Sequence, residues 1–300
     1  MYRRLILASS LLVSGSILAQ DSVDRSAAAH RQFVSAFVLL ESSSELATSQ
    51  ARSTKRERRT AAIFLKQALL DAGLTPQSQR YAHRNAVAIL DLLLPPMRGE
   101  NVYLDLPATE KAAATVVVGA HYDTVADSPG ADDNASGVSA VMQIAQRLAA
   151  MERRSLRFVF VFFDQEEDDI SAGSLAFLRF LNERGDRIHS MHNLDMLGWD
   201  GDGDRHVEID ASNVALTVHY QAAAIAHGLG VTSVKYNSSD HIPFRDSGLD
   251  AVCIGEEVVT GDRSPHYHSR TDTADTLDYA FLARVTLMVG DVMATLAVGE

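Results

Sequence analysis

The sequence predicts an α/β protein: a three-layer α/β/α architecture in which helices cover both faces of a mixed, mostly parallel central sheet. Two observations carry this prediction. Apolar runs of strand length alternate with segments of helical periodicity, and several of the runs are apolar enough to be buried on both faces. The chain has 300 residues, 46% of them hydrophobic, which is enough to bury a sizeable core.

The N-terminus has the pattern of a secretory signal peptide. Arg3 and Arg4 precede a short apolar stretch that ends at about Ala19, too short and wrongly flanked for a membrane span. We therefore expect a signal peptide at 1–19 and a single domain at 20–300, with an uncleaved N-terminal anchor as the alternative. The protein is expected to be periplasmic or secreted, with no stable membrane insertion after the signal is removed.

Strands and helices can be placed from the spacing of apolar residues. Runs of strand length are NAVAILDLLL (85–94), TVVVGA (115–120), LRFVFVFF (156–163), IHSMHNLDML (188–197) and DAVCIG (250–255). Helical spacing and stop signals predict helices at 60–71, 138–148, 175–185, 213–227 and 279–297. The basic run at 55–59 is expected on a solvated helix face.

Charge and cysteine content restrict the function. The formal net charge of −12 repels phosphate backbones and anionic lipids, so nucleic acid is not an expected partner. The single cysteine, Cys253, excludes an intramolecular disulfide and a thiolate metal cluster. A metal site in this chain must therefore use His, Asp and Glu side chains.

Polar residues gather just past the carboxyl ends of four predicted strands, which is where open α/β sheets place their ligand sites. His121 and Asp123 lie two apart on extended backbone, so their side chains point the same way. A metal-binding imidazole usually donates its other N–H to a carboxylate, a role that Asp123 suits. GADDNASG (130–137) then sets Asp132 and Asp133 between glycines ahead of a helix, where a helix N-cap is the alternative to a metal site.

Further carboxylates and a histidine follow the next strands. Glu166 and Glu167 cannot share one environment, so one can bind a cation while the other stays free as a base; a solvated acidic loop is the alternative. Asp195 ends its strand among apolar neighbours, where a charge needs a partner. The same cluster continues in SPHYHSRTDT with His266, His268 and Asp272. Together these residues offer a His/Asp/Glu ligand set suited to zinc.

The motifs HYDT, PGADDNASG, FFDQEE, NLDMLG, SDHIPF and PHYHSRTDT stand in the order seen in co-catalytic zinc aminopeptidases of the bacterial leucyl aminopeptidase and aminopeptidase Y type. The chain resembles this family over about residues 60–275. The resemblance implies a zinc exopeptidase type of fold. It also implies two zinc ions bridged by Asp133, with Glu167 and His268 completing one site and His121 and Asp195 the other.

The same resemblance implies the catalytic roles. Glu166 would be the general base, Asp123 the partner of His121, Tyr236 a stabiliser of the oxyanion, and a zinc-bridging water the nucleophile. The implied function is an exported dizinc aminopeptidase that removes the N-terminal residue of peptides with a free amino end. His266 competes with His268 as a ligand, but the Tyr-His pair and the spacing to Asp272 favour His268.

Other functions stay open at this point. A zinc-dependent glutaminyl-peptide cyclotransferase has a similar fold and similar motifs but holds one metal, and a non-catalytic zinc or peptide-binding protein would have no use for Glu166. A carboxypeptidase acting on acidic C-termini would need a basic cluster, for which Arg245, Arg263 and Arg270 are the candidates. DGDGD (200–204) resembles a calcium loop, but Arg205 and Ala211 replace its required Gly and Glu, so an exposed turn is expected.

Overall fold

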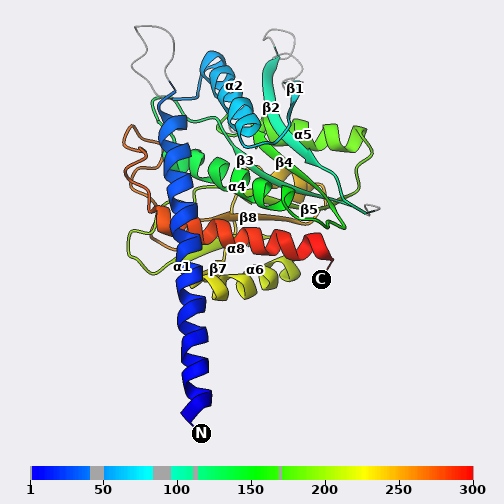
Figure 1. Cartoon of the computed structure of the whole chain (residues 1–300). Helices are drawn as coiled ribbons and strands as arrows, with labels where there is room; N and C mark the ends of the chain where they lie inside the picture. The colour runs from blue at the N-terminus through cyan, green and yellow to red at the C-terminus, as the bar shows by residue number, and fades with distance from the viewer. Residues whose placement is uncertain (1, 41–50, 84–95, 111–113, 169–170, 300) are drawn as a thin grey trace.

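The computed structural model describes residues 2–40, 51–83, 96–110, 114–168 and 171–299, with side chains from residue 19 onward. Its centre is a sheet in the order β1-β2-β4-β3-β5-β8-β6-β7 (Figure 1). The strands are β1 (Pro76–His83), β2 (Met97–Leu106), β3 (Thr115–His121), β4 (Arg157–Phe163), β5 (Ile188–Leu194), β6 (His206–Ala211), β7 (Gly230–Ser233) and β8 (Ala251–Gly255).

Parallel pairing is confined to two parts of the sheet. The neighbouring strands β4, β3, β5 and β8 run parallel to one another, and β6 pairs in parallel with β7. In contrast, β1 with β2, β2 with β4, and β6 with β8 are antiparallel. The sheet is therefore mixed and its central strands are parallel, so four carboxyl ends meet at one edge.

Helices cover both faces of the sheet. They are α1 (Tyr2–Val38), α2 (Lys55–Asp71), α4 (Gly137–Ala149), α5 (Ala172–Glu183), α6 (Val214–His227), α7 (Ile242–Asp246) and α8 (Tyr279–Val298). The turn η1 (Ala131–Ser136) precedes α4 and has non-helical backbone angles at Asp133 and Asn134. On β4, Phe158, Phe160 and Phe162 pack into the core under α2, α4, α6 and α8, whereas Val159, Val161 and Phe163 pack into the core under α5. Because successive strand residues face opposite sides, one strand serves both cores, and the predicted α/β architecture is confirmed.

The helices on the α4 face include two that are long. α1 packs against α4 and α8, as Figure 1 shows for its C-terminal half. His30 of α1 is fully buried there, with Nδ1 2.7 Å from Ser139 Oγ and Nε2 3.0 Å from Thr286 Oγ1. Among the described residues, α8 has the length and apolarity of a membrane span, but 67% of that window is buried inside the protein. α8 is accordingly a core helix.

Several boundaries and elements differ from the prediction. The strand expected at 85–94 lies outside the described residues, and β1, β2, β6 and β7 were not predicted. The helix expected at 60–71 begins at Lys55, because Thr54 and Glu57 form a capping box. The basic run is not wholly solvated: Arg58 Nε lies 2.8 Å from Asp164 Oδ1, and both side chains are largely buried.

Candidate metal centre and pocket

The central parallel strands bring the predicted ligands to one place. His121 is the last residue of β3, Asp195 follows β5 directly, Glu167 lies in the loop after β4, and His268 lies in the loop after β8. Asp133 lies within η1, between β3 and α4. These segments meet because the carboxyl ends of neighbouring parallel strands lie at the same edge of the sheet.

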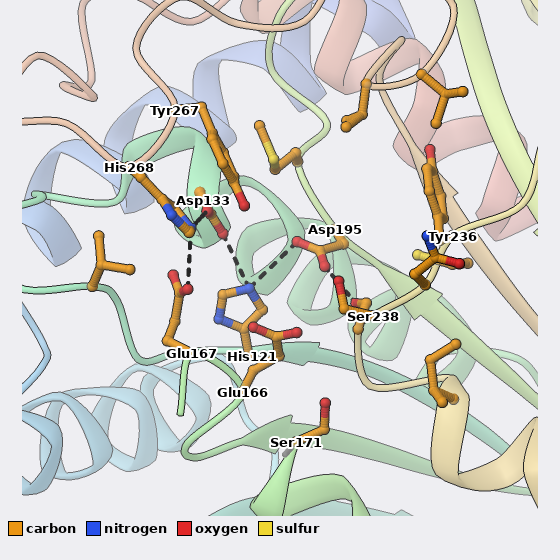
Figure 2. Close-up of a pocket in the computed structure, with 18 of the residues that line it drawn as sticks. His121, Asp133, Glu166, Glu167, Ser171, Asp195, Tyr236, Ser238, Tyr267 and His268 are labelled. Carbon is orange, nitrogen blue, oxygen red and sulfur yellow. Dashed lines mark hydrogen bonds and ion pairs between the residues drawn. The ribbon is translucent and has the colours of Figure 1, made fainter. Parts of the chain in front are cut away.

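The carboxylate of Asp133 lies between the two histidines (Figure 2). His121 Nε2 is 3.1 Å from Asp133 Oδ1 and 3.3 Å from Asp195 Oδ1. His268 Nε2 is 3.2 Å from Asp133 Oδ2 and 3.1 Å from Glu167 Oε2. Each oxygen of Asp133 therefore faces a different imidazole, and each imidazole faces one further carboxylate.

Hydrogen bonds made by the side chains of Asp272 and Asn134 hold the turn that carries Asp133. Asp272 accepts hydrogen bonds from the backbone N–H groups of Asp132 (2.8 Å) and Asp133 (3.1 Å). Asn134 Nδ2 donates to Leu194 O, and its Oδ1 accepts from Gly137 N at the start of α4. Asn134 thus does the work of a helix cap, which leaves the Asp133 carboxylate free to face the histidines.

Asp123 connects His121 to the glutamate loop. Its carboxylate accepts from the backbone N–H groups of Glu166 (3.1 Å) and Glu167 (3.3 Å). His121 Nδ1 lies 3.2 Å from the Asp123 carbonyl oxygen and 3.6 Å from its carboxylate. Asp123 therefore orients His121 mainly through its main chain, while its carboxylate positions the two glutamates.

The close carboxylates and imidazoles of the centre shift one another's pKa values. Burial by itself would lower the pKa of both imidazoles, but the adjacent carboxylates raise it, well above the ordinary value for His121 and to about 9 for His268. Burial and the charge of Asp133 raise the pKa of Glu167 to about 7. Burial opposes ionisation of Asp133, yet its contacts with His121 and His268 hold its pKa below the usual range. The centre therefore favours bound cations.

The donor set fits zinc. Nitrogen and oxygen atoms of His121, Asp133 and Glu167 all lie within 4.8 Å of one another, so ligands of both implied zinc sites lie close together. Glu167 Oε1 is buried and has no hydrogen-bond partner among the described residues, which is costly for a carboxylate unless a cation binds it. Imidazole and carboxylate are ordinary zinc ligands, and this arrangement supplies them without a thiolate.

A pocket of about 700 Å³ opens beside this centre, and Glu166 lines it together with the ligands. Figure 2 shows the Glu166 carboxylate next to His121. Burial raises the pKa of Glu166 well above its ordinary value, and the charges of Asp195 and Asp240 act in the same direction. Apolar side chains line part of the pocket, namely Met196, Ile242, Pro243, Val258 and Val259, and polar side chains from Lys235 and residues 237–239 line the rest.

Tyr236 lines the pocket, but its hydroxyl is engaged elsewhere. It donates to Glu208 Oε2 at 2.9 Å, and Figure 2 shows it pointing away from the histidines. Because that proton is already donated to a buried carboxylate, the oxyanion role predicted for Tyr236 does not fit the geometry. Tyr267 lies closer to the histidines: its ring stacks on His268 at 3.7 Å between centroids, and its hydroxyl points toward the space between Asp133 and Asp195.

Two other sequence-based choices can be compared with the geometry. His266 lies away from the centre, with Nδ1 2.8 Å from Thr271 Oγ1, so His268 is the histidine that faces Asp133. The acidic turn at 200–204 is largely exposed, and the backbone N–H groups of Gly201 and Asp202 donate to Asp262. Tyr267 stands next to His268 in PHYHS, so the sequence already placed a tyrosine near the centre. Nothing in either segment indicated whether Tyr236 or Tyr267 faces it.

Comparison with known proteins places this geometry in a family. The family model described as peptidase family M28 matches residues 101–293. The chain belongs to peptidase family M28. This membership confirms the resemblance seen in the sequence. The M28 chain is 32% identical over 176 residues to aminopeptidase YwaD of Bacillus subtilis, a match that covers 56% of this chain and 38% of that protein.

A probable leucine aminopeptidase of Trichophyton verrucosum is 26% identical over 198 residues, which is 60% of the M28 chain and 52% of that protein. The chain thus spans about half or less of these relatives. Among solved structures, the zinc aminopeptidase BSAP of Bacillus subtilis matches with a TM-score of 0.70 and 16% identity over 88% of this chain and 94% of that one. The glutaminyl cyclase of Porphyromonas gingivalis matches with a TM-score of 0.73 and 20% identity, covering 90% and 98%. Both likenesses show the fold alone.

Proposed function

We propose that this chain is an exported dizinc aminopeptidase that hydrolyses the N-terminal residue from peptides. One observation carries the proposal: each oxygen of Asp133 faces a different histidine, and each histidine faces a second carboxylate. This is the arrangement expected of a carboxylate shared by two cations. His121 and Asp195 would complete one zinc site, and Glu167 and His268 the other. The similarity to proteins named aminopeptidases supports the same reaction.

Zinc held by these residues would supply Lewis acidity, which would lower the pKa of a bound water and polarise the scissile carbonyl. Glu166 is the proposed general base, because its carboxylate lines the pocket beside the ligands and, among the described residues, forms no ion pair with either histidine. Its raised pKa suits a group that takes a proton from water and returns it to the departing amine. Asp123 holds Glu166 in place through the backbone N–H.

The remaining groups position the substrate. The hydroxyl of Tyr267 is directed at the centre and is the proposed donor to the developing oxyanion. The carboxylate-rich centre attracts the cationic amino end of a peptide, so cleavage takes one residue at a time. The apolar wall formed by residues such as Ile242 and Val258 favours an apolar first side chain.

Export is proposed from the N-terminal pattern, with cleavage after Ala19. Ala19, Gln20 and Asp21 are exposed, and Val23 is the first buried residue among the described side chains of α1. Cleavage after Ala19 would therefore fall in an exposed segment. The mass of the protein recovered from the periplasm of a bacterial host tests this, since an intact N-terminus would contradict cleavage.

The activity is tested with purified protein, zinc-loaded, on matched substrates. We expect hydrolysis of leucyl amides and of peptides with a free amino end, none of the same peptides after N-acetylation, and two zinc ions per chain by elemental analysis. Glu166→Gln should lower kcat by about 100-fold or more and keep both zinc ions, because general-base catalysis contributes about 10²–10⁴-fold. Equal turnover of the Gln variant would exclude Glu166 as the base.

The same panel separates the alternatives. Release of pyroglutamyl peptide from N-terminal glutaminyl substrates with one zinc per chain would indicate a cyclotransferase. Zinc binding without turnover of any substrate would indicate a binding protein. Cleavage of acidic residues from the C-terminus of N-acetylated peptides would indicate a carboxypeptidase.

A further inference from the structure

Arg52 is a buried cation that lies directly behind the proposed metal centre. It precedes α2, and only 1% of the residue is exposed. Its guanidinium donates to three main-chain carbonyls: Nε to Tyr122 O (2.6 Å), Nη1 to Pro129 O (2.6 Å) and Nη2 to Gly130 O (2.9 Å). Its guanidinium also lies over the ring of Phe37, with Cζ 4.6 Å from the ring centroid. Within the described part of the chain, no carboxylate forms an ion pair with it.

The carbonyls that Arg52 binds belong to the two segments that carry the ligands. Tyr122 lies between His121 and Asp123, and its carbonyl belongs to the segment leaving β3. Pro129 and Gly130 begin the turn that presents Asp133 three residues later. The backbone N–H of Arg52 also donates to Thr124 Oγ1 at 2.8 Å. One side chain therefore joins the entry and the exit of the loop at 122–130.

The fit around the guanidinium requires a glycine. Gly130 has φ +64, and a Cβ there would lie 2.7 Å from Arg52 Nη2 and 2.5 Å from the Asp133 carbonyl oxygen. The backbone thus approaches Arg52 and the metal-binding turn at the same point, which only a residue without a side chain permits. This close approach lets the planar fork reach two successive carbonyls.

A buried guanidinium without an ion pair is costly, so something nearby must stabilise it. Burial lowers the pKa of Arg52 to about 10, while the charges of Asp272, Asp123, Asp133 and Glu167 raise it, so the group stays cationic at neutral pH. The acidic centre thus stabilises Arg52, and Arg52 in turn reduces the repulsion among these carboxylates.

We propose that Arg52 is a positioning residue for the metal centre, an inference that rests on the proposed function. By binding the carbonyls of residues 122, 129 and 130, its fork sets the spacing between the segment of His121 and the turn of Asp133. That spacing decides whether the Asp133 carboxylate reaches both histidines. Arg52 touches no substrate; it acts through the ligands.

The test compares Arg52→Met and Arg52→Lys with Arg154→Met. Arg154 is a matched control, because it is also buried and donates to main-chain carbonyls, those of Leu148, Met151 and Pro107, away from the ligand loops. Zinc affinity is measured by competition with a chromophoric chelator, and ligand geometry by the visible absorption of the Co²⁺-substituted protein. Unfolding of the metal-free variants by circular dichroism reports the structural contribution separately.

We expect Arg52→Met to bind zinc about 10- to 100-fold more weakly, the effect typical of residues that orient metal ligands, and to alter the Co²⁺ spectrum. Arg52→Lys keeps the buried charge but cannot bind three carbonyls in a plane, so its spectrum should also change while it folds more readily. Arg154→Met should lose stability and keep the zinc affinity and the spectrum of the parent.

Specific outcomes would overturn the inference. One is a folded Arg52→Lys or Arg52→Met protein with zinc affinity within twofold of the parent and the parental Co²⁺ spectrum. Another is an equal loss of zinc affinity in Arg154→Met, which would reduce Arg52 to a general stabiliser. A parent protein that binds no zinc would instead overturn the proposed metal centre, and this inference with it.

Discussion

Substituting Phe for each of the two pocket tyrosines separates a hydroxyl that serves the reaction from one that serves the fold. Tyr267 points its hydroxyl at the centre, and Tyr236 donates its own to Glu208. Both substitutions remove a single oxygen and keep the ring. They therefore form a matched pair, in which each variant is the control for the other.

For Tyr267→Phe we expect kcat to fall about 100-fold, which corresponds to about 2.7 kcal/mol, because removing one oxyanion donor typically costs at least that much. KM should change little, since the hydroxyl is proposed to act as charge develops on the carbonyl oxygen. The ring still stacks on His268, so the zinc content and the melting temperature should stay near those of the parent.

For Tyr236→Phe we expect a lower free energy of unfolding rather than a lower kcat. Glu208 is fully buried, and it accepts from the Tyr236 hydroxyl and from the backbone N–H groups of Val259 and Thr260. Losing one hydrogen bond to a buried carboxylate costs about 2 kcal/mol. For a chain of this size that lowers Tm by about 4–8 °C, at about 2–4 °C per kcal/mol. kcat on the remaining folded protein should stay within about threefold of the parent.

The assay is steady-state hydrolysis of a leucyl chromogenic amide, paired with thermal unfolding of the zinc-loaded proteins. The reasoning is refuted if Tyr236→Phe loses as much kcat as Tyr267→Phe with an unchanged Tm. It is also refuted if Tyr267→Phe keeps kcat within twofold of the parent. Either result would return the oxyanion role to Tyr236 or to the metal alone.

Further expectations concern the metal, the ligand choice and pH. A chelator should abolish activity and lower Tm, because the folded chain loses the free energy of zinc binding. Added zinc should restore both, and full activity in the chelated protein would contradict the metal centre. His268→Ala should lose zinc while His266→Ala keeps it, as elemental analysis would report. Burial lowers the pKa of His30 to about 3 from its ordinary 6.5, so the unfolded chain binds the extra proton and stability falls as pH drops below 6.5. Relative to His30→Gln, the parent should lose about 1.4 kcal/mol of unfolding free energy between pH 7.5 and 5.5 in urea titrations; parallel pH profiles would show that His30 is already protonated in the fold.

The strands β3 and β4 were predictable because their burial on both faces shows in their own residues. Every residue of β3 is buried, and β4 is buried from Phe158 onward, so their sequences are continuous apolar runs. The edge strand β1, PQSQRYAH, has no such run, and β7 has four residues. These strands form because a neighbour supplies their hydrogen bonds, which periodicity within the segment does not record.

The meeting of polar clusters past the central strands was likewise predictable, because each cluster follows an element whose end the sequence marks. Parallel strands bring those ends to one edge whatever the loops contain. The choice of Asp133, Glu167 and His268 within those clusters came from the family resemblance. Arg52 was not predictable, because the carbonyl of Gly130 that it binds lies 78 residues away in the chain. A main-chain acceptor has no residue identity, so the sequence holds no pattern for it.

The sequence by itself thus determined which residue types stand past the central strands, and these are the types suited to binding a metal or taking a proton. The tertiary structure decided which hydrogen-bond partner each polar side chain around the centre has. Tyr236 donates to Glu208 because β6 pairs with β8 in a register that sets Glu208 opposite Gly255. Such a register depends on contacts between distant segments, and a hydroxyl has one proton to donate, so the fold and not the residue type determines its role.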